Sequence, residues 1–238
     1  MDKQQQIVKM FDEIANSYDL ANRVLSFGVD ISWRKKGCNK AFEILNKNEI
    51  SQISDIATGT GDMLIYWKSE AEKKGIEVKK FVGVDPSTKM LEVAKKKVDF
   101  ATFLEGKAQE LPLEDNSTEI ISISYGIRNV VDRKKALKEF YRSLKPGGVV
   151  VILEFTKQEK EGLIKKIVDF YMKKILPIVG GLVSKNYKAY RYLPNSIEQF
   201  LTTNMLINEL KEVGFIPKYN KSFSLGISTL IIAKKPND

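Results

Sequence analysis

The sequence predicts an α/β protein built on a mostly parallel β-sheet. Short apolar runs alternate with helix-like stretches between residues 52 and 155, and this alternation is typical of strand–helix units whose helices cover both faces of a sheet. Residues 149–153 are apolar at every position, as expected of a central parallel strand. A glycine-rich turn follows the first apolar run, where the chain is expected to pass from strand to helix.

The elements can be placed in order along the chain. The first 47 residues have a mainly helical pattern, and the next hundred alternate between the two kinds of element. Strands are expected at residues 52–57, 80–85, 101–105, 119–124 and 148–155, with helices at 62–74, 87–97 and 132–144. Residues 162–185 and 196–213 are expected to form two more helices. Residues 215–235 are expected to form a hairpin around Leu225 and Gly226, which gives a mixed sheet of seven strands.

Length and composition favour one domain. The chain has 238 residues, 43% of them hydrophobic, which is enough for a sizeable core. We expect an N-terminal helical cap (1–47), a ligand-binding core (48–155), a helical insertion (156–200) and a C-terminal helix with the hairpin (201–238). The polar first residues lack the apolar core of a signal peptide, and no apolar stretch has the length of a membrane span. We therefore expect a cytoplasmic protein.

The residue counts exclude several kinds of chemistry. The chain has no histidine and one cysteine, Cys38, so a Ser-His-Asp triad, a Cys-His pair and an internal disulfide are excluded, and no metal site is expected. The formal net charge is +9. Three interpretations of that charge stay open, namely a solubilising lysine-rich surface, attraction to nucleic acid, and attraction to an anionic membrane.

The turn at residues 55–62 is the first candidate site. It runs Asp55-Ile-Ala-Thr-Gly59-Thr60-Gly61-Asp62, and its glycines allow the backbone to approach a ligand closely while the following helix offers free N–H groups to a carboxylate. The third glycine of a dinucleotide motif is absent, which disfavours NAD. No Gly-Lys-Ser/Thr follows, which excludes a P-loop. We predict that the turn binds S-adenosylmethionine, with Thr60 and Asp62 beside its methionine part; a simple tight turn is the alternative.

A carboxylate at the end of the second strand supports this prediction. Asp85 ends the run at residues 81–85, where an acid is placed to bind both hydroxyls of a ribose. The alternative is that Asp85 caps the next helix, but Ser87 is already a good N-cap. We also expect the ends of the third and fourth strands to flank the loop of the first and to cradle the rest of the cofactor.

Four sequence motifs in order resemble one family. They are residues 18–28 followed by Trp33, residues 125–130 (Tyr-Gly-Ile-Arg-Asn-Val), residues 142–148 with 153–155, and residues 190–197 (Tyr-Arg-Tyr-Leu-Pro-Asn-Ser-Ile). Over nearly its whole length the chain resembles the ubiquinone/menaquinone biosynthesis C-methyltransferases (UbiE/MenG type). The resemblance implies a seven-stranded Rossmann-like class I S-adenosylmethionine-dependent methyltransferase fold.

The same resemblance implies a substrate and a set of cofactor residues. The substrate would be a polyprenyl quinol methylated on a ring carbon, either demethylmenaquinol or 2-methoxy-6-polyprenyl-1,4-benzoquinol. By matching positions, Thr60 would lie in the glycine loop, Asp85 at the ribose, Lys107 and Ala108 at the adenine, and Ser124 after the fourth strand. The chain departs from the family pattern at Ala21, where methionine is usual, at Asp30, where histidine is usual, and at Lys107. A lysine side chain cannot accept a hydrogen bond from the adenine amino group, so the backbone of Ala108 would recognise the base.

Arg128 is the first candidate for catalysis and Tyr192 the second. Methylation of a ring carbon requires an electron-rich ring, which forms when a quinol hydroxyl loses its proton. A guanidinium stays protonated and can hold the resulting phenolate or an activating water. A structural salt bridge is the alternative role for Arg128.

The partners remain open in three respects. Leu163, Ile164, Ile167, Val168, Tyr171 and Ile175 share one helical face, with Lys165, Lys166 and Lys173 opposite, which fits either a membrane-surface helix or a helix packed on the sheet. A nucleic-acid methyltransferase and a non-catalytic lipid- or cofactor-binding protein are alternative functions. Residues 124–127 lack the stacking segment of base N-methylation enzymes and Cys38 precedes the first strand, so no nucleic-acid partner is expected. A homo-oligomer or a complex of quinone-biosynthesis enzymes also stays open.

Overall fold

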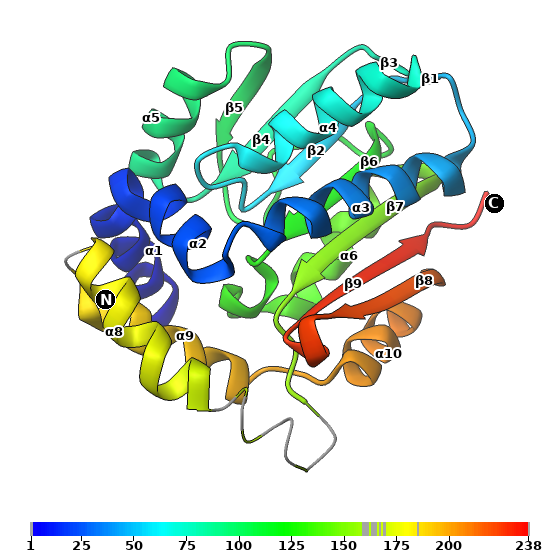
Figure 1. Ribbon diagram of the computed structural model, residues 1–238. Coiled ribbons are helices and arrows are strands. Elements are labelled where there is room, and N and C mark those ends of the chain that lie inside the picture. The colour runs from blue at the N-terminus through cyan, green and yellow to red at the C-terminus, as the bar shows by residue number, and fades with distance from the viewer. Residues whose placement is uncertain are drawn as a thin grey trace.

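The computed structural model describes residues 2–158, 162, 166, 168, 170–184 and 186–237. Its centre is a sheet of seven strands in the order β5-β4-β2-β6-β7-β9-β8 (Figure 1). The strands β5, β4, β2, β6 and β7 are parallel, and β9 pairs antiparallel with β7 and β8. The bounds are β2 Ile53–Ile56, β4 Phe81–Asp85, β5 Ala101–Glu105, β6 Thr118–Ser124, β7 Leu144–Glu154, β8 Ile216–Phe223 and β9 Ser228–Lys234. The mixed sheet with a C-terminal hairpin is confirmed.

Helices cover both faces of this sheet. On one face lie α3 (Val29–Leu45) and α4 (Asp62–Lys74), and on the other α6 (Arg133–Ser143) and α10 (Thr203–Val213). The helix α5 (Thr88–Lys97) packs along β4 and β5. In β7, Val149, Val151 and Leu153 belong to the apolar core on the side of α3 and α4. Val150 and Ile152 belong to the core on the side of α6 and α10. The all-apolar run is therefore explained by burial on both faces.

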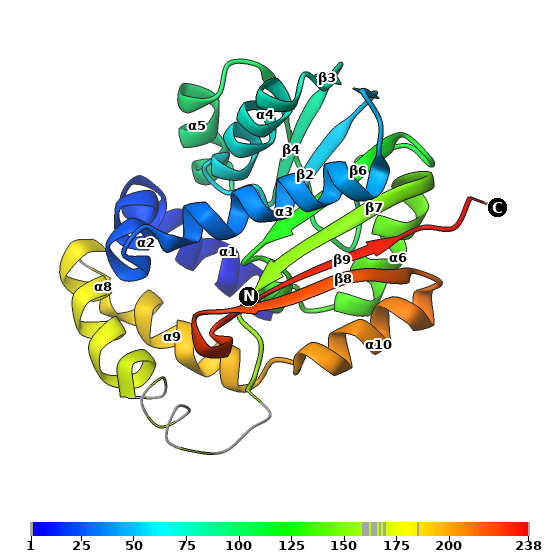
Figure 2. The ribbon, with the colours of Figure 1, turned by 45° about the vertical axis from the view of Figure 1, so that its right-hand side comes forward.

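A third helical layer lies at the carboxyl ends of the parallel strands (Figures 1 and 2). It contains α1 (Lys3–Ile14), a 3₁₀ turn (Ala15–Ser17), α2 (Tyr18–Ser26), a π-helical turn (Tyr171–Ile175), α8 (Leu176–Ser184) and α9 (Tyr187–Glu198). A separate apolar cluster joins these helices, which includes Ile14, Ala21, Leu176 and Tyr190. This layer closes the edge of the sheet where α/β proteins bind ligands.

Three boundaries differ from the sequence predictions. The single helix at residues 196–213 is wrong, because α9 ends at Glu198 and α10 begins after Thr202, whose side chain caps it. The strand predicted from residue 148 begins at Leu144, which pairs with Thr118 before a register shift. A small parallel sheet, β1 (Glu49–Ile50) with β3 (Glu77–Val78), was not predicted because its strands are two residues long.

The strand order corrects one further expectation. The strands beside β2 are β4 and β6, so the third strand of the core, β5, lies at the sheet edge and does not flank the loop of β2. The loop after β5 still returns toward β4, since Gly106 N donates to Asp85 O at 3.2 Å. Order along the chain does not determine position in a sheet whose strands are joined by crossovers, so the third strand of the core can lie at the edge.

The helix predicted at residues 162–185 is described in part. Leu163, Ile164, Lys165 and Ile167 lie outside the described residues. Val168 is buried, and the Tyr171 hydroxyl donates to Leu25 O at 2.6 Å, so these two side chains pack inward and do not form a membrane-facing surface. None of the helices in the described ranges has the length and apolar content needed to cross a membrane.

Candidate active site

The glycine loop after β2 leaves space for a ligand. Ala57, Gly59 and Gly61 all have positive φ, at 51°, 57° and 82°, and Gly61 is the N-cap of α4. No atom lies within 4 Å of the position that a Cβ on Gly59 would occupy. Gly59 forms part of the wall of a cavity of about 70 Å³, which we call the smaller cavity. The loop therefore exposes backbone to this cavity, as a close approach to a ligand requires.

Asp85 lies in the wall of the same cavity. Its carboxylate accepts hydrogen bonds from Gly59 N and Ser87 N, both at 2.8 Å, and the residue is 6% exposed. Burial raises the pKa of Asp85 to about 6, against the lowering effect of the two N–H donors. Ser87, and not Asp85, caps α5 by accepting from Met90 N at 3.1 Å. Each carboxylate oxygen keeps acceptor capacity for a ligand hydroxyl.

The other end of the smaller cavity is formed by residues after β5 and β6. Lys107, Ala108 and Ser124 all line it. Ala108 is buried, whereas the Lys107 side chain is exposed. This arrangement agrees with a base read by the backbone at Ala108.

Helix α1 forms the outer wall of the smaller cavity through Ile7, Val8 and Phe11. Hydrogen bonds fix the helix at both ends. Gln4 Nε2 donates to Asn129 O at 3.4 Å and Gln4 Oε1 accepts from Val131 N at 3.1 Å, while Ser87 Oγ donates to Asp12 at 2.6 Å. A ligand in this cavity would be enclosed by the N-terminal helix.

Four predicted cofactor residues lie outside the walls of both main cavities in the described part of the chain, namely Asp55, Thr60, Gly61 and Asp62. Asp55 supports β2 from within: it accepts from Ser122 Oγ at 2.6 Å, and burial raises its pKa to about 7. Their role in cofactor binding stays a prediction that these side-chain positions do not favour.

Thr60 and Asp62 are engaged by the N-terminal helix α2. Thr60 Oγ1 donates to Asp19 at 2.5 Å, and Lys97 Nζ lies 2.7 Å from both Asp19 and Asp62. Arg23 of α2 donates to Asp62 at 2.5 Å. These contacts, which we call the cap–loop network, attach α2 to the glycine loop.

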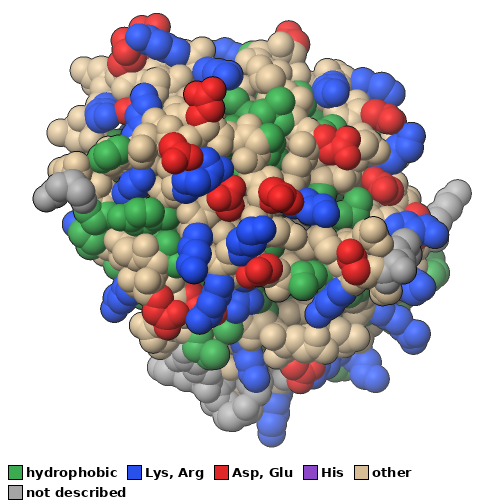
Figure 3. Space-filling model, turned by 180° about the vertical axis from the view of Figure 1, so that it is seen from behind, with side chains coloured by type: hydrophobic (Ala, Val, Ile, Leu, Met, Phe, Trp, Pro, Cys, Tyr) green, Lys and Arg blue, Asp and Glu red, His purple; other side chains and the backbone are tan. Residues whose placement is uncertain are grey.

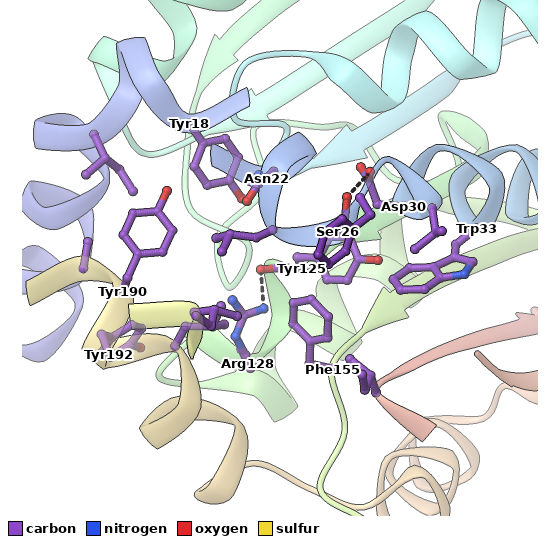
Figure 4. Close-up of a pocket in the computed structure, with 18 of the residues that line it drawn as sticks. Tyr18, Asn22, Ser26, Asp30, Trp33, Tyr125, Arg128, Phe155, Tyr190 and Tyr192 are labelled. Carbon is purple, nitrogen blue, oxygen red and sulfur yellow. Dashed lines mark hydrogen bonds between the residues drawn. The ribbon is translucent and has the colours of Figure 1, made fainter. Parts of the chain in front are cut away.

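A larger cavity of about 260 Å³ adjoins the smaller one, and the two share Phe11, Tyr18 and Tyr125 in their walls (Figure 4). Its wall is mainly apolar and aromatic. It includes Met10, Ile14, Leu25, Phe27, Val29, Trp33, Phe155, Leu176, Tyr190, Leu193 and Ile227. An aromatic ring with an apolar tail fits this chemistry.

Arg128 lies in the wall of the larger cavity and also forms a buried salt bridge. Its Nη1 donates to Glu154 at 2.5 Å and to Tyr125 O at 2.8 Å, and its Nε to Ser196 Oγ at 3.3 Å. Burial raises the pKa of Glu154, although Arg128 opposes that shift. Among the described residues no partner binds Arg128 Nη2, so this donor remains for a ligand. Arg128 can therefore form a structural salt bridge with Glu154 and still offer one donor to a substrate.

Tyr192 lies in the same wall, but its hydroxyl donates to Asn129 Oδ1 at 3.0 Å. Asn129 in turn donates to Tyr125 O at 3.3 Å. The Tyr192 hydroxyl proton is therefore already committed, which weakens the case for Tyr192 as a catalytic group.

Asp30, where the family pattern has histidine, is buried between Arg23, Arg34 and Ser26, all of which donate to it. Burial alone would raise the pKa of Asp30, but these donors hold it below its ordinary value. Arg34 also lies over the Tyr125 ring, 5.2 Å from its centroid. Sequence reasoning missed this cluster, although the i,i+4 spacing of Asp30 and Arg34 was a readable signal of an ion pair.

Comparisons with known proteins agree with this geometry. A model of the ubiE/COQ5 methyltransferase family matches residues 1–235. A Campylobacter jejuni protein named ubiquinone/menaquinone biosynthesis C-methyltransferase UbiE is 53% identical over 235 residues, covering 99% of this chain and all of that protein. A Thermotoga maritima protein named demethylmenaquinone methyltransferase is 39% identical, covering 91% of this chain and 90% of that protein. A solved SAM-dependent methyltransferase of Thermotoga maritima shares the fold, with a TM-score of 0.60 and 23% identity, over 96% of this chain and 99% of that one.

The raised pKa of Asp85 predicts a pH-dependent affinity. The charged carboxylate is the better acceptor for ribose hydroxyls, so affinity for S-adenosylhomocysteine is expected to be constant above pH 7 and to fall about 10-fold by pH 5 as Asp85 takes up a proton. Calorimetric titration between pH 5 and 8 measures this. Asp85→Asn should bind weakly at every pH, whereas Asp55→Asn should retain the decline. If Asp85→Asn showed the same fall in affinity between pH 7 and pH 5 as the wild type, the pH dependence would belong to another group.

Proposed function

The chain belongs to the ubiE/COQ5 methyltransferase family and is an S-adenosylmethionine-dependent methyltransferase, and we propose that its substrate is a polyprenyl quinol methylated on a ring carbon. Menaquinone biosynthesis, ubiquinone biosynthesis, or both would use the product. One observation carries the proposal: an apolar, aromatic cavity with a cationic donor adjoins a smaller cavity with a buried carboxylate.

The residues of the smaller cavity fit S-adenosylmethionine. The open space over Gly59 admits the cofactor, the Asp85 carboxylate suits the ribose hydroxyls, and the Ala108 backbone suits the adenine. A helix N-terminus attracts a carboxylate, but the N-cap Gly61 and the first residue Asp62 of α4 lie outside the walls of the smaller cavity, so the methionine carboxylate at this helix end stays a prediction. When bound, the cofactor supplies an electrophilic methyl group. Helix α1, which forms the outer wall of this cavity, would shield a bound cofactor from water.

Arg128 is proposed to stabilise charge on the quinol. Transfer of a proton from one hydroxyl to a water molecule moves electron density to the neighbouring ring carbon, and Arg128 Nη2 can hold the phenolate oxygen that results. Glu154 and the carbonyl of Tyr125 fix the guanidinium, so it does not need to reorient as charge develops. The stacked rings of Tyr125 and Phe155, with centroids 4.5 Å apart, give an apolar surface for the substrate ring.

A methyl-transfer assay tests the proposal. With labelled S-adenosylmethionine, the protein is expected to methylate short-chain demethylmenaquinol, the benzoquinol analogue, or both, in side-by-side reactions. Transfer to neither quinol would overturn the proposal. Because the Arg128 guanidinium is proposed to lie at the reacting ring, removal of this guanidinium should lower kcat about 100-fold and leave cofactor affinity nearly unchanged.

The matched variant is a double substitution. Arg128→Ala alone would leave Glu154 buried without its partner, at a cost of ~3–5 kcal/mol of stability. Arg128→Gln with Glu154→Gln removes both charges and separates the loss of catalysis from unfolding. Glu154→Gln alone retains the guanidinium but loses the carboxylate that fixes it, so its activity should fall less than that of the double variant.

On the face seen in Figure 3, the distribution of charge gives no support to nucleic acid as the substrate. On the face opposite to the view of Figure 1, lysine and arginine side chains are interspersed with aspartate and glutamate (Figure 3). A nucleic-acid interface instead gathers basic side chains along one stripe. Basic side chains on that face are therefore mixed with acidic ones and form no such stripe.

We also propose that the protein docks on a membrane through an exposed apolar rim beside the larger cavity. Leu20 and Val24 lie along α2 and Phe27 follows its last residue, while Ile175, Ile178 and Leu182 lie along the neighbouring π-turn and α8. Phe27 is 84% and Leu182 65% exposed. Phe27 also lines the larger cavity, so the rim is continuous with the place proposed for the quinol ring.

Charge near the rim favours an anionic bilayer as the occupant. Three exposed lysines lie on either side of α8: Lys173 and Lys174 in the π-turn before it, and Lys188 in α9 after it. Basic side chains next to exposed apolar ones are typical of proteins that bind the surface of anionic membranes. The rim would let a polyprenyl tail stay in the lipid while the ring enters the cavity.

Vesicle co-sedimentation tests the docking. The wild-type protein is expected to bind vesicles containing anionic lipid at low salt. Phe27→Asp with Leu182→Asp should lower binding about 10-fold or more, because two apolar anchors are replaced by charges. Met205→Asp, at an exposed apolar site on α10 and outside both cavity walls, is the control. Absence of vesicle binding by the wild type, or self-association that the rim variant abolishes, would contradict the membrane proposal.

A further inference from the structure

One tyrosine in the larger cavity differs from its neighbours. The hydroxyls of Tyr125, Tyr171 and Tyr192 have protein partners: Ser228 Oγ at 3.3 Å, Leu25 O at 2.6 Å and Asn129 Oδ1 at 3.0 Å. Tyr190 is 5% exposed, and its buried hydroxyl has no hydrogen-bond partner among the described residues. A buried polar group without a partner costs free energy, so such groups are rare unless a ligand or water satisfies them.

Packing fixes the Tyr190 ring in this position. A Cβ on Gly180 of α8 would lie 2.3 Å from Tyr190 Cδ1, so only glycine admits the ring. The Ser184 hydroxyl is close enough to lower the pKa of Tyr190, which burial and the nearby Tyr18 raise, but it lies outside hydrogen-bond geometry. Ser184 is already engaged, since it donates to Gly180 O at 2.7 Å and accepts from Asn186 N at 3.2 Å.

The hydroxyl of Tyr190 is directed away from α9 and toward Tyr18, on the side of the cavity that faces α2 (Figure 4). Arg128 enters the same cavity from the turn after β6. Arg128 and Tyr190 therefore line one apolar cavity from different elements. A 1,4-quinol has two oxygens on opposite sides of its ring, and only the one next to the methylated carbon activates that carbon.

We propose that Tyr190 binds the second, non-activating hydroxyl of the quinol and so fixes which ring carbon faces the methyl donor. This inference rests on the proposed function, because it assigns the other hydroxyl to Arg128. A site that hydrogen-bonds a substrate hydroxyl rejects an analogue that lacks it, since the protein group then stays unpaired. Tyr190 would therefore make the enzyme selective for dihydroxy rings over monohydroxy rings.

The test compares two substrates in three proteins. The substrates are short-chain demethylmenaquinol and the matching naphthol that lacks the hydroxyl para to the activating one. The proteins are the wild type, Tyr190→Phe and Tyr192→Phe. In Tyr190→Phe, kcat/KM for the quinol should fall about 10-fold, the value of one hydrogen bond at the upper end of its range, while that for the naphthol stays within about 2-fold. Tyr192→Phe should affect both substrates alike, because its hydroxyl binds Asn129.

Each outcome decides between the two proposals. An active wild type whose Tyr190→Phe variant loses nothing, or loses equally on both substrates, overturns the role of Tyr190 and leaves the proposed function intact. A wild type that methylates neither ring overturns both. All three proteins should unfold cooperatively and bind S-adenosylhomocysteine with the same affinity, which shows that the fold and the smaller cavity are preserved.

Discussion

The cap–loop network is the interaction on which the arrangement of the site depends. Lys97 of α5 binds Asp19 and Asp62 together, and Arg23 extends the network from Asp62 to Asp30. Its members come from α2, α3, α4 and α5, so it joins the helical layer to the glycine loop. Because α2 contributes Tyr18 to both cavities, the position of α2 sets the shared wall between them. The side chains of Lys97, Asp62 and Arg23 are only half-buried, so salt should weaken this attachment more than a core contact.

The remaining site groups are placed by strand ends. Asp85 ends β4, Ser124 ends β6, and Glu154 ends β7, where it orients Arg128. These strands belong to the parallel stretch β4-β2-β6-β7, so their carboxyl ends meet at one edge of the sheet. A polar binding site for a nucleoside and an apolar one for a ring can then lie side by side, with the Tyr125 ring between them.

Much of the fold followed from the sequence, because short apolar runs between helix-like stretches and the terminal hairpin have clear local signals. The break between α9 and α10 was missed because residues 199–202 carry no glycine or proline. The position of β5 was missed because crossover order is not a local property. In the site, Asp85 could be placed from its strand end, whereas Thr60 and Asp62 are bound by Asp19, Lys97 and Arg23, which are distant along the chain. Tyr190 and Tyr192 are two residues apart on one helix, and the sequence does not show which hydroxyl is left unpaired.

The dependence of both cavities on the cap–loop network can be measured by hydrogen–deuterium exchange of Lys97→Met. Lys89→Met is the matched control on the same helix, because Lys89 pairs only with Glu92 among the described residues. The structure predicts faster exchange throughout α1 and α2 in Lys97→Met, with the sheet unchanged, and wild-type exchange in Lys89→Met. Wild-type protection of α1 and α2 in Lys97→Met would contradict the view that this network holds the helical layer over the site.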